Sequence, residues 1–165
     1  MAYLADPDAT SSNPLELMEQ IVASHDWPFD RSAEGELTVA VAGTWCEYHL
    51  CASFRDRERA LQLTCAFDLR VAPARRAEMA QLLVLINEQL WLGHFDLWSE
   101  EGVLMFRYGM LLGGGVATAS QCEDLIEIAI GESERFYPAF QLLLWGGKTP
   151  AEALATALFE TVGEA

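Results

Sequence analysis

The residues that could take part in chemistry are scattered along the chain and complete no known catalytic or metal-binding pattern. His25, His49 and His94 lie far apart in sequence. His49 shares a predicted strand face with Cys51, and this pair supplies at most two of the three or four ligands that zinc takes. A Cys–His nucleophile pair could assemble across the fold, yet no nucleophile elbow surrounds any serine or cysteine. We therefore predict no metal, no cofactor, no catalytic residues and no enzymatic activity.

Two glycine-rich segments partly match phosphate-binding loops. Residues 142–149 read LLLWGGKT, but Leu142 stands where the Walker A motif requires glycine, and a helix rather than a strand precedes the lysine. Residues 113–115 are three glycines without the GxGxxG spacing or a following lysine. We interpret the first segment as a helix end and the second as a flexible strand-to-helix connection.

The charge balance argues against nucleic acids and membranes as partners. Ten Lys and Arg residues oppose 25 Asp and Glu residues, which gives a formal net charge of −15. Such a surface repels nucleic-acid phosphates and anionic lipid headgroups. Arg55, Arg57 and Arg59 alternate with acidic residues and indicate a solvated turn. We expect neither nucleic-acid nor membrane binding.

Further features of the sequence favour a cytoplasmic protein. No segment holds the roughly 20 apolar residues that a membrane-spanning helix needs. The first residues lack the basic and apolar regions of a secretory signal. The cysteines Cys46, Cys51, Cys65 and Cys122 show no CxxC spacing, so we expect them to stay reduced.

The strands are predicted by alternation of apolar and polar residues. Residues 37–41, 46–54 and 61–67 alternate with period two, which is typical of antiparallel strands with one buried face. The short connections between them fit a meander of hairpins. Residues 95–98 and 103–110 predict a further hairpin.

The helices are predicted by capping residues and by apolar residues at helical spacing. We expect a helix over residues 14–25, capped by Asn13 with a capping box from Glu16, and another over residues 73–91. Ser120 is expected to cap a long helix in a capping box with Glu123, and Pro138 should kink or split that helix. A short last helix begins at Thr149-Pro150.

These elements predict one α+β domain with an antiparallel sheet and helices packed on one face. The expected order is helix, three strands, helix, two strands, helix and a short final helix. Residues 1–12 are predicted to be a flexible tail, and residues 13–165 the single domain.

The helix predicted over residues 73–91 carries more apolar residues than one buried face needs. Its core stripe includes Met79, Leu82, Leu83, Ile86 and Leu90. A second stripe, which we call the partner stripe, consists of Ala77, Ala80, Val84 and Trp91. Because the core uses only the first stripe, we predict that the partner stripe binds another layer or subunit.

Several segments of the chain together resemble the YbjN-like family of bacterial proteins, which are labelled sensory transduction regulators. These segments are residues 71–76, 86–88, 93–95, 102–107, 135–140 and 146–153. The resemblance covers about residues 14–155 and implies the fold of type III secretion chaperones. Proteins of that fold are commonly homodimers that bind extended client segments. The family offers no enzymatic activity, cofactor or catalytic residue to carry over.

The matched residues have sufficient structural explanations. We expect Asn87 to hydrogen-bond a nearby loop backbone and Gly93 to take a positive φ at the helix end. Arg107 should pair with a carboxylate on the polar face of the sheet, and Pro138 should shape the long helix.

The leading hypothesis is a homodimeric regulatory or chaperone-like module that holds a protein client of unknown identity, by strand addition or in a groove for a helix. The alternative is a small-ligand sensor, with a pocket between the sheet and the helices near the loop at Gly113. An unrecognised hydrolase is a third hypothesis, which requires an unusually reactive Cys or His.

Overall fold

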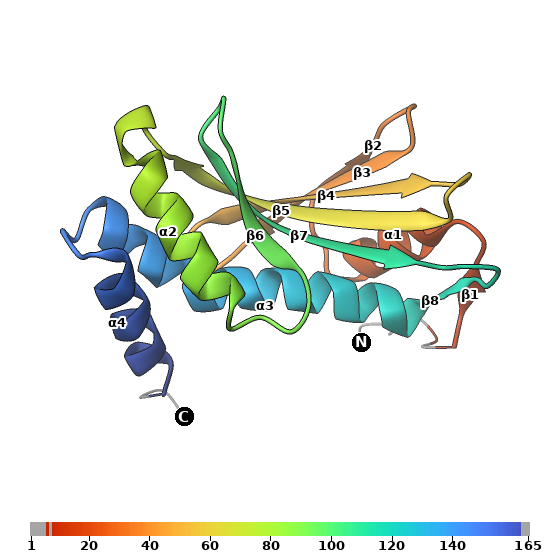
Figure 1. Ribbon diagram of the computed structural model, residues 1–165. Coiled ribbons are helices and arrows are strands. Elements are labelled where there is room, and N and C mark those ends of the chain that lie inside the picture. Colours follow the sequence, from red (N-terminus) through yellow and green to blue (C-terminus); the bar gives the residue numbers. More distant parts are fainter. Residues whose placement is uncertain (1–5, 7, 163–165) are drawn as a thin grey trace.

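The computed structural model describes residue 6 and residues 8–162 of the chain. Six strands form one antiparallel sheet in the order β2-β3-β4-β5-β7-β6 (Figure 1). The strands are β2 (Phe29–Arg31), β3 (Glu36–Ala42), β4 (Glu47–Arg55), β5 (Ala60–Arg70), β6 (His94–Trp98) and β7 (Val103–Leu111). The helices are α1 (Pro14–Ser24), α2 (Arg76–Asn87), α3 (Ala119–Leu144) and α4 (Pro150–Val162), and a 3₁₀ turn (Pro73–Arg75) precedes α2. The predicted α+β class with an antiparallel sheet is confirmed.

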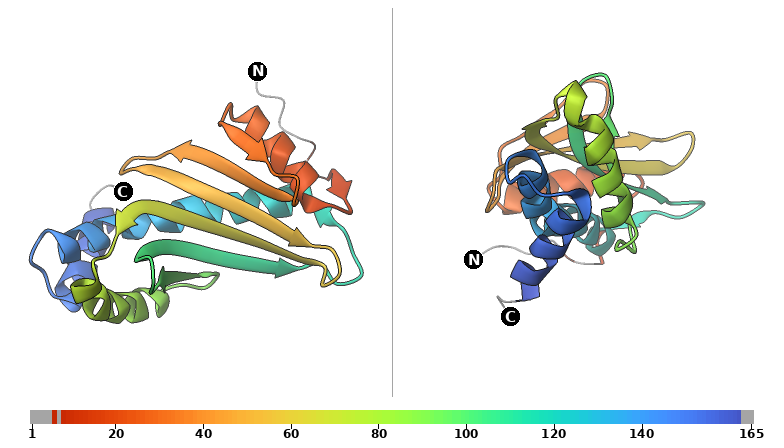
Figure 2. Two further views of the ribbon diagram at one scale, coloured as in Figure 1. Left: turned by 90° about the horizontal axis from the view of Figure 1, so that it is seen from above. Right: turned by 60° about the vertical axis from the view of Figure 1, so that its left-hand side comes forward.

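Two helices cover one face of the sheet. α1 packs against β3 and β4, and α3 packs against β5 and β7. Viewed from the other side, the strands lie in front of α3, and no element of the described residues crosses them (Figure 2, left). α2 and α4 pack against each other at one end of α3, and α2 also contacts β6. The sheet therefore has one helix-covered face, and we call the opposite face the outer face.

The register of the strands follows from the alternation in the sequence. Val39 of β3 lies opposite Leu50 of β4, which lies opposite Cys65 of β5, and all three side chains are buried under the helices. Their neighbours along each strand, such as Thr38 and Cys51, point to the outer face. A shift of one residue would exchange the two faces, so burial fixes this register.

An aromatic cluster joins α3 to the sheet. Phe136 and Phe140 of α3 are fully buried against Phe67 of β5 and Phe95 of β6. The ring centroids of Phe95 and Phe140 are 5.4 Å apart with an edge-to-face arrangement, which is a favourable geometry for ring pairs. This cluster fixes the position of α3 along the sheet.

Two helix starts match the sequence signals, and one differs. The Asn13 side chain accepts a hydrogen bond from the Leu15 N–H at 3.1 Å, as predicted, although the Glu16 carboxylate accepts from the Ser11 hydroxyl instead of completing a capping box. At the start of α4 the predicted cap is present. The cap predicted at Ser120 is wrong, because Thr118 caps α3 in a reciprocal box with Gln121. The chain enters α3 from a short strand, β8 (Ala117–Thr118), so the cap lies two residues earlier.

The long helix α3 is not split at Pro138, so of the predicted kink or split the split is wrong. Proline in a helix interior costs about 3 kcal/mol because it removes one hydrogen bond and crowds the preceding turn. Here Phe136, Ala139 and Phe140 around the proline are fully buried. We infer that their burial against the sheet offsets that cost and keeps the helix continuous.

Three short strands were not predicted. They are β2 at the sheet edge and the pair β1 (Thr10–Ser11) and β8 (Ala117–Thr118), which form a separate two-stranded ladder. Of the predicted flexible tail 1–12, residues 1–5 and 7 lie outside the described residues, and residues 10–11 form β1. Strands of two or three residues are too short to show a period-two pattern.

Prediction for the core. Phe140→Ala should lower the free energy of unfolding by about 3–5 kcal/mol, because the change removes a fully buried ring and leaves a cavity between α3 and the sheet. Phe159→Ala is the matched control, since this ring is 81% exposed and its loss should change stability by no more than about 0.5 kcal/mol. Urea unfolding of both variants at one protein concentration gives the comparison. Equal losses in the two variants would contradict the packing of α3 described above.

Candidate interaction surface

The partner stripe is exposed to solvent in the described structure. Ala77, Ala80 and Val84 lie on the side of α2 that faces away from the core residues Met79 and Leu82. The side chain of Val84 is 61% exposed, and that of Trp91 is 99% exposed. Within α2, the residues predicted for the core and for the partner stripe are therefore separated as the helical pattern indicated, whereas Leu90 of the predicted core stripe lies beyond the helix and is half-buried.

Trp91 is not a helical residue, which corrects the predicted helix 73–91. α2 ends at Asn87, and Trp91 lies in the connection to β6. The Asn87 amide gives the reason: its Oδ1 accepts from the Phe95 N–H at 2.8 Å, and its Nδ2 donates to the Phe95 carbonyl at 3.1 Å. The predicted hydrogen bond from Asn87 to backbone is confirmed, although the backbone belongs to strand β6. Gly93 has a φ of +68° as expected, and a Cβ there would collide with the Phe106 ring.

Two arginines at the start of α2 fix the orientation of the helix. The Arg75 guanidinium donates to the Leu143 carbonyl at 2.7 Å and so satisfies the end of α3, and it also pairs with Glu78. The Arg76 guanidinium donates to the Val71 carbonyl at 3.1 Å and to the Ser99 carbonyl. These bonds join α2 to α3, to the end of β5 and to the β6–β7 turn. The side of α2 that carries Ala77, Ala80 and Val84 is consequently held in one orientation relative to the rest of the domain.

A shallow groove runs between α2 and α4 next to the partner stripe. The groove has a volume of about 410 Å³ and is lined by Gln81, Val84, Leu85, Thr149, Pro150 and Ala151. Pro150 and Ala151 of α4 and the preceding Thr149 contribute half of its lining, which the sequence analysis did not predict. A signal was available, because Ala151, Ala155 and Phe159 recur every four residues and are exposed, whereas Ala153 and Ala157 are buried.

The outer face of the sheet is lined mostly by small or polar side chains. His49, Cys51 and Thr64 lie at its centre, and the His49 ring approaches Glu47 at 3.7 Å. Arg107 forms an ion pair with Asp96 at 2.9 Å, which confirms the predicted pairing of Arg107 with a carboxylate. In the part of the chain that the structure describes, no three His, Cys, Asp or Glu side chains gather into a group that could hold a metal ion.

The thiols are poorly suited to nucleophilic attack. Burial raises the pKa of the Cys65 thiol to about 12 and that of Cys122 to about 11. Burial also raises the pKa of Cys46 and of Cys51 above the usual value. A raised pKa lowers the thiolate fraction at neutral pH, and the thiolate is the reactive form.

Glu134 of α3 binds the turn that connects β3 to β4. Its Oε1 accepts a hydrogen bond from the Thr44 N–H at 2.8 Å. The Tyr48 ring is fully buried beside it, and burial followed by the Glu134 carboxylate raises the pKa of Tyr48. A Cβ on Gly43 would collide with both Tyr48 and Glu134, so this glycine permits the close approach. The cluster holds the turn against α3.

The space between the sheet and α3 is filled by buried aliphatic and aromatic side chains. The loop at Gly113 is a turn in which Gly113 has a φ of +57°. A nearby depression on the outer face is lined by Ser53, Gln62 and Arg107, on the side of the sheet away from the helices. The pocket that the sensor hypothesis places between sheet and helices therefore coincides with the core.

The segment 142–149 ends α3 and begins α4, in line with its interpretation as a helix end.

The comparisons with known proteins support the resemblance found in the sequence. The model of the YbjN family, described as "Putative bacterial sensory transduction regulator", matches residues 14–142. No curated protein matches the sequence closely enough to count as a relative. The fold is similar to the crystal structure of YbjN, a putative transcription regulator from E. coli, with 13% sequence identity and a TM-score of 0.54. The likeness covers 75% of this chain and 88% of that chain.

This structural likeness concerns the fold alone, because so low an identity carries no function with it. The match to the family model ends at Leu142, so α4 and its side of the groove lie beyond it. The relation to type III secretion chaperones stays a prediction. Among the described residues, no helix has the length and apolar character needed to span a membrane.

Prediction for the thiols. With a disulfide reagent at pH 8, Cys65 and Cys122 should react only as fast as the protein unfolds, because both are buried with raised pKa values. Cys46 and Cys51 should react more slowly than free cysteine. Mass spectrometry of single-cysteine variants measures each rate. A thiol that reacts faster than free cysteine would contradict this account and favour the hydrolase hypothesis.

Prediction for the end of α2. Asn87→Ala should lower the free energy of unfolding by about 1–3 kcal/mol, because it leaves the Phe95 N–H and carbonyl without their partner. Amide hydrogen exchange at Phe95 should also become faster. Gln89→Ala, at an exposed position two residues later, is the control and should change neither quantity. An unchanged exchange rate at Phe95 in the first variant would show that the Asn87 bonds do not protect β6.

Proposed function

The chain belongs to the YbjN family, and we propose that it acts as a regulatory protein-interaction module in the cytoplasm, without enzymatic activity. The observation that carries the proposal is the exposure of Val84 and Trp91 on a protein whose formal net charge is −15. A fully exposed tryptophan is unusual on a monomer, and tryptophan is enriched at protein interfaces. This surface is therefore best explained by contact with another polypeptide.

We propose that the partner stripe forms a homodimer contact. A twofold contact brings the same patch of both subunits together, so the patch has to match itself. Ala77 and Ala80 are small enough to let two helices approach closely, and Val84 and Trp91 supply apolar area. The stripe itself has no charged member, which limits repulsion between two acidic chains at the contact. The adjacent groove between α2 and α4 would extend this surface.

Several of the described residues that could take part in chemistry have structural roles. The cysteines have raised pKa values, and Arg107 is engaged by Asp96. Arg75, Arg76 and Asn87, which belong to the segments that resemble the family, all bind main-chain groups. These residues support the scaffold that presents the stripe.

Prediction for the dimer. The purified chain at tens of micromolar should have the mass of a dimer in sedimentation or light scattering. Val84→Glu and Trp91→Glu should each give a monomer, because each places a buried, unpaired charge in the contact. Leu111→Glu is the matched control: it makes the same kind of change at an exposed apolar residue at the end of β7 and should leave the dimer intact. A parent chain that is a clean monomer removes the dimer, and variants with unchanged mass reject this interface.

A further inference from the structure

The two edges of the sheet differ in whether another strand can join them. At the β6 edge, Asn87 occupies both the N–H and the carbonyl of Phe95, and the Asp96 carboxylate accepts from the Leu97 N–H at 2.9 Å. Side chains of the protein thus satisfy both outward backbone groups of Phe95 and the outward N–H of Leu97. A strand that approached β6 would have to displace these bonds. The β6 edge is closed.

The β2 edge is open, and the hydrogen-bond alternation shows which groups it presents. The Ala40 N–H donates to the Pro28 carbonyl, and the Ser32 N–H donates to the Glu36 carbonyl. In an antiparallel ladder, paired and outward-facing residues alternate. Phe29 and Arg31, which lie between these pairs, therefore direct their N–H and carbonyl groups away from β3. Within the described part of the chain no hydrogen bond occupies these four groups.

The side chains around this edge form a seat for an incoming strand. Phe29 is 40% exposed and, with Glu16, Glu19, Gln20 and Ala23 of α1, lines a hollow of about 380 Å³. Phe29 lies opposite the buried Val39, so it is on the helix side of the sheet. The side chains of an added strand that point to this side would enter the hollow between α1 and β2.

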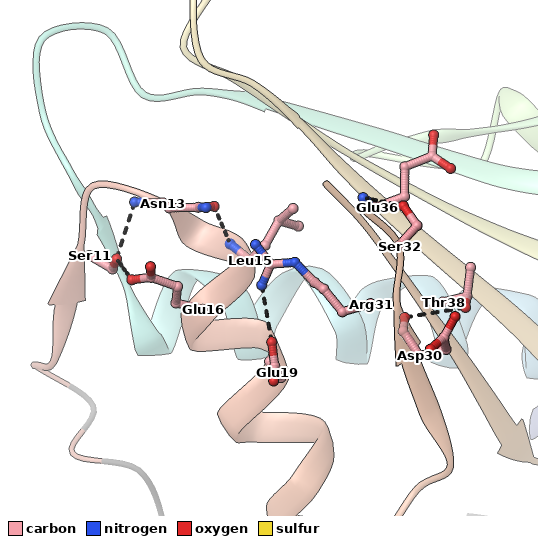
Figure 3. A network of polar contacts seen from close by, with 10 residues as sticks. All are labelled: Ser11, Asn13, Leu15, Glu16, Glu19, Asp30, Arg31, Ser32, Glu36 and Thr38. Atoms are coloured by element: carbon pink, nitrogen blue, oxygen red, sulfur yellow. Dashed lines mark hydrogen bonds and ion pairs between the residues drawn. The ribbon is translucent and has the colours of Figure 1, made fainter. Parts of the chain in front are cut away.

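The charges around the seat favour a basic segment. Arg31 reaches from β2 to α1 and pairs with Glu19 at 3.0 Å, and Glu16 lies one turn earlier on the same helix (Figure 3). Each carboxylate accepts one described hydrogen bond, and a carboxylate has room for more. A lysine or arginine can lay its aliphatic stem on Phe29 and Ala23 and direct its cation to Glu16 and Glu19. A second copy of this chain would bring another net charge of −15 to the same place.

We propose that the free edge of β2 takes up an extended, lysine- or arginine-bearing segment of another protein as a seventh strand of the sheet. Main-chain bonds to Phe29 and Arg31 would hold the segment, and the hollow beside α1 would select basic side chains on one face of it. The inference rests on the proposal that the chain binds polypeptides. It concerns the edge opposite α2 and does not depend on the homodimer contact.

The test uses the full chain and a labelled peptide of alternating lysine and valine. Fluorescence anisotropy should show binding that weakens as salt is added, because the attraction is between charges near the surface. A peptide of alternating glutamate and valine should not bind. The lysine–valine peptide with every backbone nitrogen methylated should bind at least about tenfold more weakly, because it has no donors for strand pairing.

A matched pair of variants places the binding site. Gln20→Lys adds a positive charge to the hollow beside α1 without removing a described hydrogen bond, and it should weaken lysine–valine binding about tenfold. Gln89→Lys makes the same change near the β6 edge and should leave binding unchanged. Amide exchange at Phe29 and Arg31 should slow when the peptide is added, whereas exchange at Leu97 should not change.

The outcomes separate the possible occupants. If the two variants weaken binding equally, or if the methylated peptide binds as well as its parent, the attraction is diffuse and the proposal is overturned. If the mass of the chain falls from dimer to monomer on Phe29→Pro, which removes an outward donor at β2, a second copy occupies the edge and the proposal is again wrong. Loss of the dimer on Val84→Glu with unchanged peptide binding would support both sites independently.

Discussion

The architecture depends on covering one apolar face of a six-stranded sheet with helices that come from both ends of the described chain. α1 covers the half near β3 and β4, and α3 covers the half near β5 and β7. The rings of Phe136 and Phe140 lock α3 onto Phe67 and Phe95 at the middle of the domain. This packing is strong enough to keep α3 continuous through Pro138. The opposite face needs no cover, because its central side chains are small or polar.

α2 has a different kind of support. Its core stripe packs inward, but its direction is set by polar bonds at its two ends, from Arg75 and Arg76 at the start and from Asn87 at the end. All three bind main-chain groups of neighbouring elements, so the helix cannot rotate about its axis without breaking them. The partner-stripe residues on this helix, Ala77, Ala80 and Val84, are therefore held facing solvent. A rigidly presented apolar stripe is well suited to a specific contact, because little conformational entropy remains to be lost on binding.

The two edges of the sheet also differ in the polar groups that surround them. Asn87 both ends α2 and closes the β6 edge, so one residue links the helix surface to the protection of the sheet. At the β2 edge the neighbouring α1 supplies carboxylates rather than a blocking amide. Acidic surroundings discourage pairing between two copies of the chain while leaving the main-chain groups accessible. The protein thus presents an apolar surface at one end and an acidic, open edge on the other side of the sheet.

The sequence by itself determined which faces of the elements are buried. Period-two alternation identified β3, β4 and β5, and helical spacing separated Met79 and Leu82 from Ala77 and Val84. The matched segments also identified the family, which the family model confirms. These are local properties, because a side chain's face depends only on its place in the repeat. Tertiary structure decided the rest: where α2 ends, what Arg75 binds 68 residues away, and which sheet edge stays open. Each of these depends on a partner brought close only by folding, and no local pattern in the sequence records that proximity.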